Sequence, residues 1–176
     1  HSDYSGFGVS AAGAEDGFVS VTVAGGTGGY TYNWSNGADT PIVTGLGAGT
    51  YVVVVTDENG CSVSIEVTLN TPQELTISET HSDYTGFGVS CNGETDGFID
   101  VTVTGGAGEI TYSWSNGADT EDVSDLGAGI YSVTATDENG NSVSIEVEIT
   151  EADAMAISET HSDYTGYGVS CNGASD

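Results

Sequence analysis

The sequence repeats itself with a period of 80 residues, and no other feature constrains the fold as strongly. The tetrapeptide His-Ser-Asp-Tyr begins at His1 and begins again at His81 and His161. The first two copies align without a gap, and about fifty of their aligned positions are identical. A fixed period of this kind is the sequence signature of a tandem array. We therefore expect residues 1–73 to form a first repeat, 74–153 a second and 154–176 the start of a third.

The copies are not equally complete. The first copy has no counterpart of residues 74–80, which precede His81 in the second. We therefore expect the first repeat to lack its leading strand. We also expect the printed sequence to be part of a longer chain with further repeats.

The composition excludes two classes of partner. The chain has no Lys, no Arg and 27 Asp and Glu, which give a formal net charge of −27. Binding to nucleic acid is excluded because phosphate neutralisation requires cationic side chains. Membrane insertion is not expected, because no apolar run reaches the length of a transmembrane helix. The apolar fraction of 37% argues against disorder. No secretory leader is visible, so we expect the export signals to lie outside the printed sequence.

The local pattern predicts an all-β fold. Apolar and polar residues alternate in short runs that end at Gly, Asn or Asp, and no segment has a helical period. Asn59-Gly60 and Asn139-Gly140 predict type I′ hairpin turns. Six or seven strands per repeat, with turns every eight to twelve residues, predict tandem immunoglobulin-like β-sandwiches of about 80 residues each. The expected strands of the second repeat are 98–103, 110–114, 122–126, 131–136 and 142–149, led by 75–78, with 155–158 leading the third.

The large aromatic residues support a sandwich. Trp34 and Trp114 lie on the expected third strand, where such folds bury an aromatic side chain. Tyr51 and Tyr131 follow Leu-Gly-Ala-Gly, a pattern that predicts a tyrosine corner. We expect all four in the core, with surface platforms for stacking on sugars as the alternative.

The size of the repeat suggests that it depends on its neighbours. A domain of about 80 residues buries only about 60% of its unfolded surface and is marginally stable alone. Contacts between repeats or bound ions are expected to supply the remainder, as in other linear arrays. Strands of about ten residues, at ~3.3 Å each, predict repeats about 33 Å long and an extended stalk.

Several acidic loops are candidate calcium sites. Calcium takes six to eight oxygen ligands and suits extracellular modules. None of these loops has the EF-hand spacing, and the alternative is a hairpin turn with exposed acidic groups. No cofactor is required by this sequence, and calcium is a candidate ion. The candidate ligands are Asp16, Asp57, Glu58, Asn59, Asp96, Asp137, Glu138 and Asn139.

A second candidate metal site lies between the repeats. Glu79, His81 and Asp83 could bind a transition metal through two carboxylates and an imidazole. The alternative is that His81 and Asp83 fix a turn.

The three cysteines are an odd number. Cys91 and Cys171 occupy one position of the repeat, where the first copy has Ala11, and Cys61 occupies a position where the second copy has Asn141. No bridge can therefore form within either repeat. An inter-repeat disulfide between Cys61 and Cys91 would require Cα atoms closer than about 7 Å. The alternatives are free, buried thiols, with an intermolecular bond at Cys171.

Five motifs of the second repeat occur in a fixed order. They are Val89-Ser90-Cys91-Asn92-Gly93, Asp96-Gly97-Phe98, 101–106 (VTVTGG), 112–117 (YSWSNG) and Leu126-Gly127-Ala128-Gly129 followed by Tyr131. This ordered string resembles the SprB repeat, and Cys61 after Asp-Glu-Asn-Gly resembles its closing motif. The resemblance implies an extracellular, cell-surface location, export by the type IX system and a role in adhesion or gliding, as in the large surface adhesins of gliding Bacteroidota. The copy-specific loss of one cysteine departs from the family's pattern.

No pattern for catalysis is present. The sequence has no nucleophile elbow and no phosphate-binding loop, and the three histidines are copies of one position. The expected function is a structural repeat of a secreted bacterial surface adhesin or filament, not an enzyme. Its expected partners are neighbouring repeats, other chains in a filament, and a surface polysaccharide or substratum. The alternatives are a carbohydrate-binding module attached to a secreted enzyme and a subunit of an assembled fibre.

Overall fold

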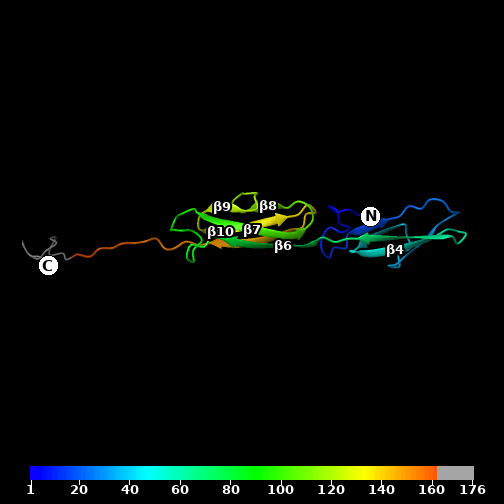
Figure 1. The fold of residues 1–176 in the computed structure, drawn as a ribbon, viewed down its shortest axis with the longest axis horizontal. Helices are drawn as coiled ribbons and strands as arrows, with labels where there is room; N and C mark the ends of the chain where they lie inside the picture. The colour runs from blue at the N-terminus through cyan, green and yellow to red at the C-terminus, as the bar shows by residue number, and fades with distance from the viewer. Residues whose placement is uncertain (162–176) are drawn as a thin grey trace, which may run out of the picture.

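The computed structural model describes residues 1–161 and places two β-sandwich repeats end to end (Figure 1). Every regular element within these residues is a strand, so the all-β prediction is confirmed. No helix in this part of the chain is long and apolar enough to cross a membrane. The strands of the first repeat are β1 (Gly17–Ser20), β2 (Thr31–Trp34), β3 (Ile42–Leu46), β4 (Gly49–Thr56) and β5 (Ser62–Leu69). Those of the second are β6 (Gln73–His81), β7 (Gly97–Gly106), β8 (Thr111–Trp114), β9 (Val123–Leu126), β10 (Gly129–Thr136) and β11 (Ser142–Ile149).

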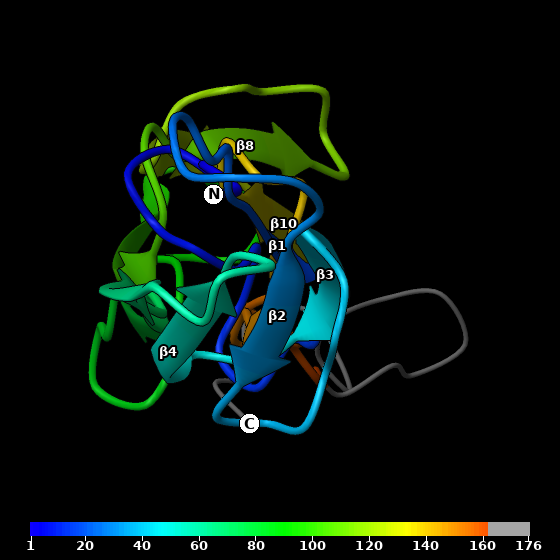
Figure 2. The same cartoon turned by 90° about the vertical axis from the view of Figure 1, so that its right-hand side faces the viewer.

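Each repeat consists of two antiparallel sheets. In the second repeat, one sheet has the order β6-β7-β9 and the other β11-β10-β8. In the first repeat, β1 pairs with β3, and β2-β4-β5 forms the second sheet. Viewed along the long axis, the two repeats lie one behind the other (Figure 2).

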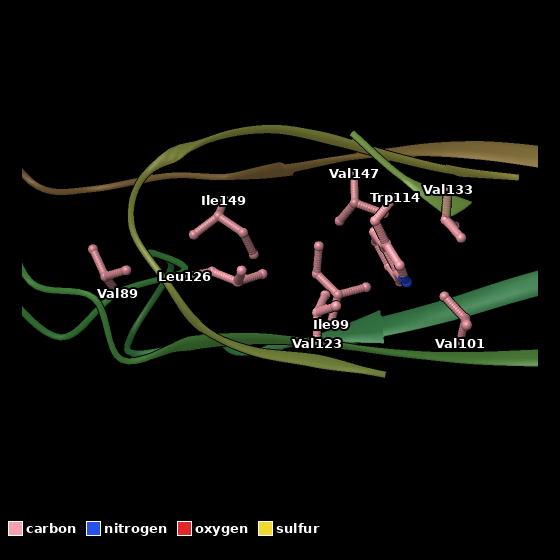
Figure 3. Packing of buried hydrophobic residues seen from close by; sticks show 9 residues of the cluster. All are labelled: Val89, Ile99, Val101, Trp114, Val123, Leu126, Val133, Val147 and Ile149. Atoms are coloured by element: carbon pink, nitrogen blue, oxygen red, sulfur yellow. The ribbon is translucent and has the colours of Figure 1, made fainter. Parts of the chain in front are cut away.

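The core of the second repeat comes from both sheets. Strict alternation in β7 buries Ile99 and Val101 and turns Phe98 and Asp100 outward. Trp114 belongs to β8 in the opposite sheet. It lies between Ile99 and Val101 on one side and the buried residues of its own sheet on the other (Figure 3). Its indole Nε1 donates a hydrogen bond to the Thr120 carbonyl at 2.8 Å, so the one polar atom of the ring is satisfied.

The first repeat has the same kind of core. Trp34 is buried in it, and its Nε1 donates to the Thr40 carbonyl at 2.8 Å. Burial of both tryptophans removes them as platforms for stacking on sugars. The aromatic residues at the start of β4 and β10 complete the pattern. The Tyr51 hydroxyl donates to the Gly47 carbonyl at 2.9 Å, and the Tyr131 hydroxyl to the Gly127 carbonyl at 3.1 Å. Each is a tyrosine corner, and the immunoglobulin-like sandwich is confirmed.

The leading strand β6 makes the two repeats different. It pairs with β7 from Gln73 opposite Gly106 to His81 opposite Ile99, and β7 is therefore ten residues long. Its counterpart β1 is only four residues long. Val21 and Val23 continue the line of β1 but are not assigned to a strand. A strand needs a neighbouring strand whose backbone N–H and C=O groups can form hydrogen bonds with its own. Among the described residues, no leading strand lies beside β1.

Two predictions about local structure were wrong. The Asn-Gly turns are not type I′, because Gly60 has a φ of 84° while Asn59 does not have a positive φ. Gly60 N donates to the Asp57 carbonyl at 3.0 Å, which is a type I turn followed by a left-handed glycine. The Asp57 carboxylate accepts the Asn59 N–H at 3.0 Å and thereby stabilises this turn.

The segment 155–158 forms no strand in the structure. Met155 and Ile157 are fully exposed, because no described strand lies beside them. The rest of the expected third repeat (154–176), residues 162–176 with Cys171, lies outside the described part of the chain.

Candidate functional site

The junction between the two repeats is the best-defined contact surface in the structure. Only residues 70–72 separate β5 from β6, so the last strand of one repeat leads directly into the first strand of the next. Side chains of the β10–β11 turn then reach back to the first repeat. Asn139 Nδ2 and Asn141 Nδ2 donate to the Ser10 carbonyl at 3.0 Å and 2.8 Å. The Ser5 hydroxyl donates to Asn139 Oδ1 at 3.3 Å.

Hydrogen bonds within the first repeat fix the loop that receives these asparagines. Gly8 N donates to the Asn70 carbonyl at 2.8 Å, and the Thr71 hydroxyl donates to the Ala11 carbonyl at 3.3 Å. Asp16 accepts the Ser10 N–H at 3.1 Å. Hydrogen bonding from Ser10 lowers the pKa of Asp16, so the carboxylate is charged at neutral pH. The loop is thus tied both to the end of β5 and to its own acidic residue.

Asp137 lies at the centre of the turn from the second repeat. It is only 4% exposed. Its carboxylate accepts the N–H groups of Ala107, Asn139 and Asn141 at 3.1, 3.0 and 2.9 Å, and the Asn141 side-chain amide at 3.0 Å. Burial acts to raise the pKa of Asp137, but these hydrogen bonds, from the Asn141 side chain above all, outweigh it and lower the pKa. The charged carboxylate therefore organises the turn that contacts the first repeat.

Asp57 occupies the same place in the first repeat. Its carboxylate accepts the N–H groups of Thr27, Asn59 and Cys61 at 3.0, 3.0 and 2.9 Å. Hydrogen bonding from Cys61 and Thr27 lowers its pKa. This turn lies at the outer end of the first repeat, and no described residue of another repeat covers it. The same sequence motif thus forms a contact at one position and an open surface at the other.

The predicted calcium ligands lie on the two Asn-Gly turns and on the two loops that contain Asp16 and Asp96. Asp16 and Asp96 cap equivalent loops through Ser10 and Ser90, the latter at 3.0 Å. Glu58 and Glu138 lie over Gly28 and Gly108, where a Cβ would overlap each carboxylate. Within residues 1–161, no three His, Cys, Asp or Glu side chains gather as a metal site. Calcium binding by these loops, Asn59 and Asn139 included, stays a prediction.

Glu79, His81 and Asp83 do not gather as a metal site in the described part of the chain. His81 Nδ1 pairs with Glu79 Oε2 at 2.9 Å. Asp83 Oδ1 instead accepts the Gly86 N–H at 2.6 Å. The alternative interpretation was that His81 and Asp83 fix a turn. Asp83 does so, whereas His81 is the last residue of β6 and pairs with Glu79.

Comparison with known proteins identifies the repeating unit. The family model described as SprB repeat matches residues 11–39 and 89–119. Both segments are SprB repeats. No curated protein matches the chain. Among solved structures, the chain is similar to the amphioxus IgVJ-C2 molecule, with 16% identity and a TM-score of 0.37, over 78% of this chain and 97% of that chain.

The cysteines of these SprB repeats lie at opposite ends of the pair. Cys61 follows the β4–β5 turn at the outer end of the first repeat. Cys91 lies in a loop whose Asn92 side chain donates to the Ala152 carbonyl beyond β11, at the outer end of the second. Both thiols are free and exposed, so the predicted Cys61–Cys91 bridge within one chain is wrong, and so is the expected burial.

Sequence reasoning missed the junction, although a signal was present. Ala11 and Asn141 line the same junction cavity of about 220 Å³. These two positions are the ones that carry Cys91 and Cys61 in the other copies. Both cysteines are therefore replaced together where the two positions meet across a junction. The contact joins positions in two different repeats, so the sequence of a single repeat does not reveal it.

Proposed function

We propose that this chain is a structural segment of a long secreted protein, in which SprB repeats stack end to end as the stalk of a bacterial surface adhesin or filament. The family match supports a repeat module of a surface protein of the adhesin type and an extracellular location. Export by the type IX system and a part in gliding are further elements of the proposal. They come from the family resemblance and not from the geometry.

The observation that carries the proposal is the direct junction between the repeats. A link of three residues leaves little freedom of movement, and the asparagines of the β10–β11 turn bind the first repeat across it. A domain that acts alone needs no such contact, whereas a stalk needs it at every junction. The family and the fold are typical of structural, non-enzymatic proteins.

The acidic surface fits the same role. A net charge of −27 without any Lys or Arg keeps a long chain soluble and makes stalks repel each other. Neighbouring repeats are the partners that the junction supports. Contact with other chains, or with a surface polysaccharide or substratum, is the adhesive part of the proposal.

Two experiments test the proposal. Small-angle X-ray scattering should give a rod whose length matches two stacked repeats, at about 33 Å for each repeat. A profile of two freely hinged domains would contradict the stalk. Antibodies raised against the chain should label intact, unpermeabilised cells of the source organism. Labelling only after permeabilisation would contradict the surface location.

A further inference from the structure

The two cysteine positions of one repeat lie at opposite ends of its last strand. In the second repeat, Asn141 directly precedes β11, whereas Cys91 lies in a loop at the other end of that strand. Asn92 of this loop donates its side-chain N–H to the Ala152 carbonyl, beyond β11, at 3.0 Å. The eight residues of β11, at ~3.3 Å each, separate the two positions by about 25 Å. A disulfide cannot span this distance, because its two Cα atoms lie within about 7 Å of each other.

The first repeat has the same arrangement. Cys61 directly precedes β5, which is also eight residues long. The Ala11 carbonyl accepts the Thr71 hydroxyl at 3.3 Å, beyond the other end of β5. We call the place of Ala11 and Cys91 the loop position, and the place of Cys61 and Asn141 the turn position. A bridge between the loop position and the turn position of a single repeat is therefore excluded by the fold in both copies.

The loop position of one repeat instead meets the turn position of the next. Ala11 and Asn141 line one junction cavity of about 220 Å³. Asn141 Nδ2 donates to the carbonyl of Ser10, the residue before Ala11, at 2.8 Å. The few covalent bonds from these two polar atoms to the Cα atoms of Asn141 and Ala11 keep the Cα atoms within about 9 Å of each other. The Cα separation that a disulfide needs, about 4.4–6.8 Å, lies inside this bound.

The distribution of the cysteines follows the junction and not the repeat. The second copy has Cys91 at its loop position, and the first copy has Cys61 at its turn position. Where the loop of the first repeat meets the turn of the second, neither position carries a cysteine, because they are Ala11 and Asn141. Pairing within a repeat would leave one cysteine without a partner in each copy. Pairing across junctions leaves no unpaired cysteine at this one.

We propose that the loop position and the turn position form a disulfide site that joins consecutive repeats wherever both carry cysteine. Cys91 is then the loop half of such a site and Cys61 the turn half, so the partner of each is a cysteine of an adjacent repeat. At the junction between the two described repeats, Asn141 replaces the covalent bond with a hydrogen bond to the Ser10 carbonyl. The proposal depends on the stacking of repeats and not on where the protein is displayed.

The bond forms by thiol–disulfide exchange with a small disulfide oxidant, for which glutathione disulfide serves in the test. The thiolate of one position attacks the oxidant, which releases one glutathione and leaves a mixed disulfide. The thiolate of the other position then displaces the second glutathione. The two protein thiols lose two protons and two electrons in total, and glutathione disulfide is reduced to two glutathione molecules.

The double variant Ala11→Cys/Asn141→Cys tests the site on the whole chain, because it places at this junction the residues of the other copies. It is made in a Cys61→Ser/Cys91→Ser/Cys171→Ser background, so that it has two thiols. In a glutathione redox buffer, we expect the monomer to lose two hydrogen atoms in mass. The bridge is then assigned in a non-reducing digest with a Glu-specific protease, because the chain has no Lys or Arg for trypsin.

The matched control carries Ala11→Cys in a Cys91→Ser/Cys171→Ser background. It also has two thiols, at residue 11 and at Cys61, but both belong to the first repeat. We expect the equilibrium constant for an intramolecular bridge to be roughly a hundredfold lower than at the junction, because the two ends of β5 hold these thiols apart. Melting curves of the reduced proteins show whether both variants fold. Small-angle X-ray scattering of the oxidised double variant should match the unaltered chain, because the bridge forms in the arrangement already present.

Three results would overturn the proposal. The first is a folded double variant that keeps both thiols in the redox buffer. The second is a bridge that forms as readily in the control as at the junction. The third is a junction bridge that changes the scattering profile, because the two positions would then not meet in the stacked arrangement. A rod-shaped chain that forms no bridge would contradict the disulfide site and leave the proposed stalk intact.

Discussion

The buried carboxylate of Asp137 should be the most sensitive single position of the junction. In Asp137→Ala, the N–H groups of Ala107, Asn139 and Asn141 lose their acceptor. Ala107 is buried, so its N–H cannot turn to water, at a cost of about 2 kcal/mol. The two asparagine N–H groups are partly accessible and cost about 0.5–1 kcal/mol each. We expect the free energy of unfolding of the second repeat to fall by about 3 kcal/mol, or its melting temperature by about 15 °C.

The first repeat supplies the matched control. Asp57 accepts the same kind of hydrogen bonds in the same turn, but water can replace it because that turn is open. Asp57→Ala should therefore destabilise the first repeat less than Asp137→Ala destabilises the second. The indole N–H resonances of Trp34 and Trp114 report each repeat separately in a urea titration followed by nuclear magnetic resonance. If Asp57→Ala and Asp137→Ala lowered the free energy of unfolding of their repeats equally, the claim that the junction buries the turn would be refuted.

Three further predictions follow from the same geometry. The pKa values of the turn-capping aspartates are lowered in the folded state, so their stabilisation is fully present above about pH 4 and is lost as the pH falls through the folded values. Melting temperatures measured from pH 7 to acid should fall in this range, and Asp137→Ala should flatten that fall; a decline as steep as in the unaltered chain would contradict it. Gly105→Ala should destabilise its repeat more than Gly25→Ala, because both have positive φ but only the first overlaps Glu74; equal losses in urea titrations would show that β6 is not closely packed there. Calcium binding by the acidic loops should raise the melting temperature more than magnesium does at the same concentration, and a chelator should reverse the rise; equal effects of the two ions would contradict the calcium sites.

The period, the strands and the core could be predicted from the sequence because each is a local or internally repeated signal. The alternation of apolar and polar residues predicted β11 from its first residue to its last, and it predicted that Trp114 lies in the core. The tyrosine corner followed from Leu-Gly-Ala-Gly before Tyr131, because the corner is formed within five residues.

The features that the sequence did not predict depend on contacts with side chains or segments outside the local pattern. The type of the Asn-Gly turn depends on the Asp57 side chain, whose hydrogen bonds to the turn outweigh the preference of the dipeptide. The length of β7 depends on β6, and the same residues in the first repeat remain irregular without that partner. The positions occupied by Ala11 and Asn141 are 130 residues apart in the sequence, and only the junction brings them together.

The placement of β6 determines how the array would carry mechanical load. Tension along the chain enters the second repeat at Gln73, next to the junction, and leaves it after Ile149 at the far end. β6 and β11 both run from the junction toward that far end, so the pull acts along the two strands in opposite senses. Their hydrogen bonds to β7 and β10 are then loaded together in shear and cannot open one after another like a zipper. A repeat held in this way resists extension with its whole ladder, which is the property that a tether exposed to drag requires.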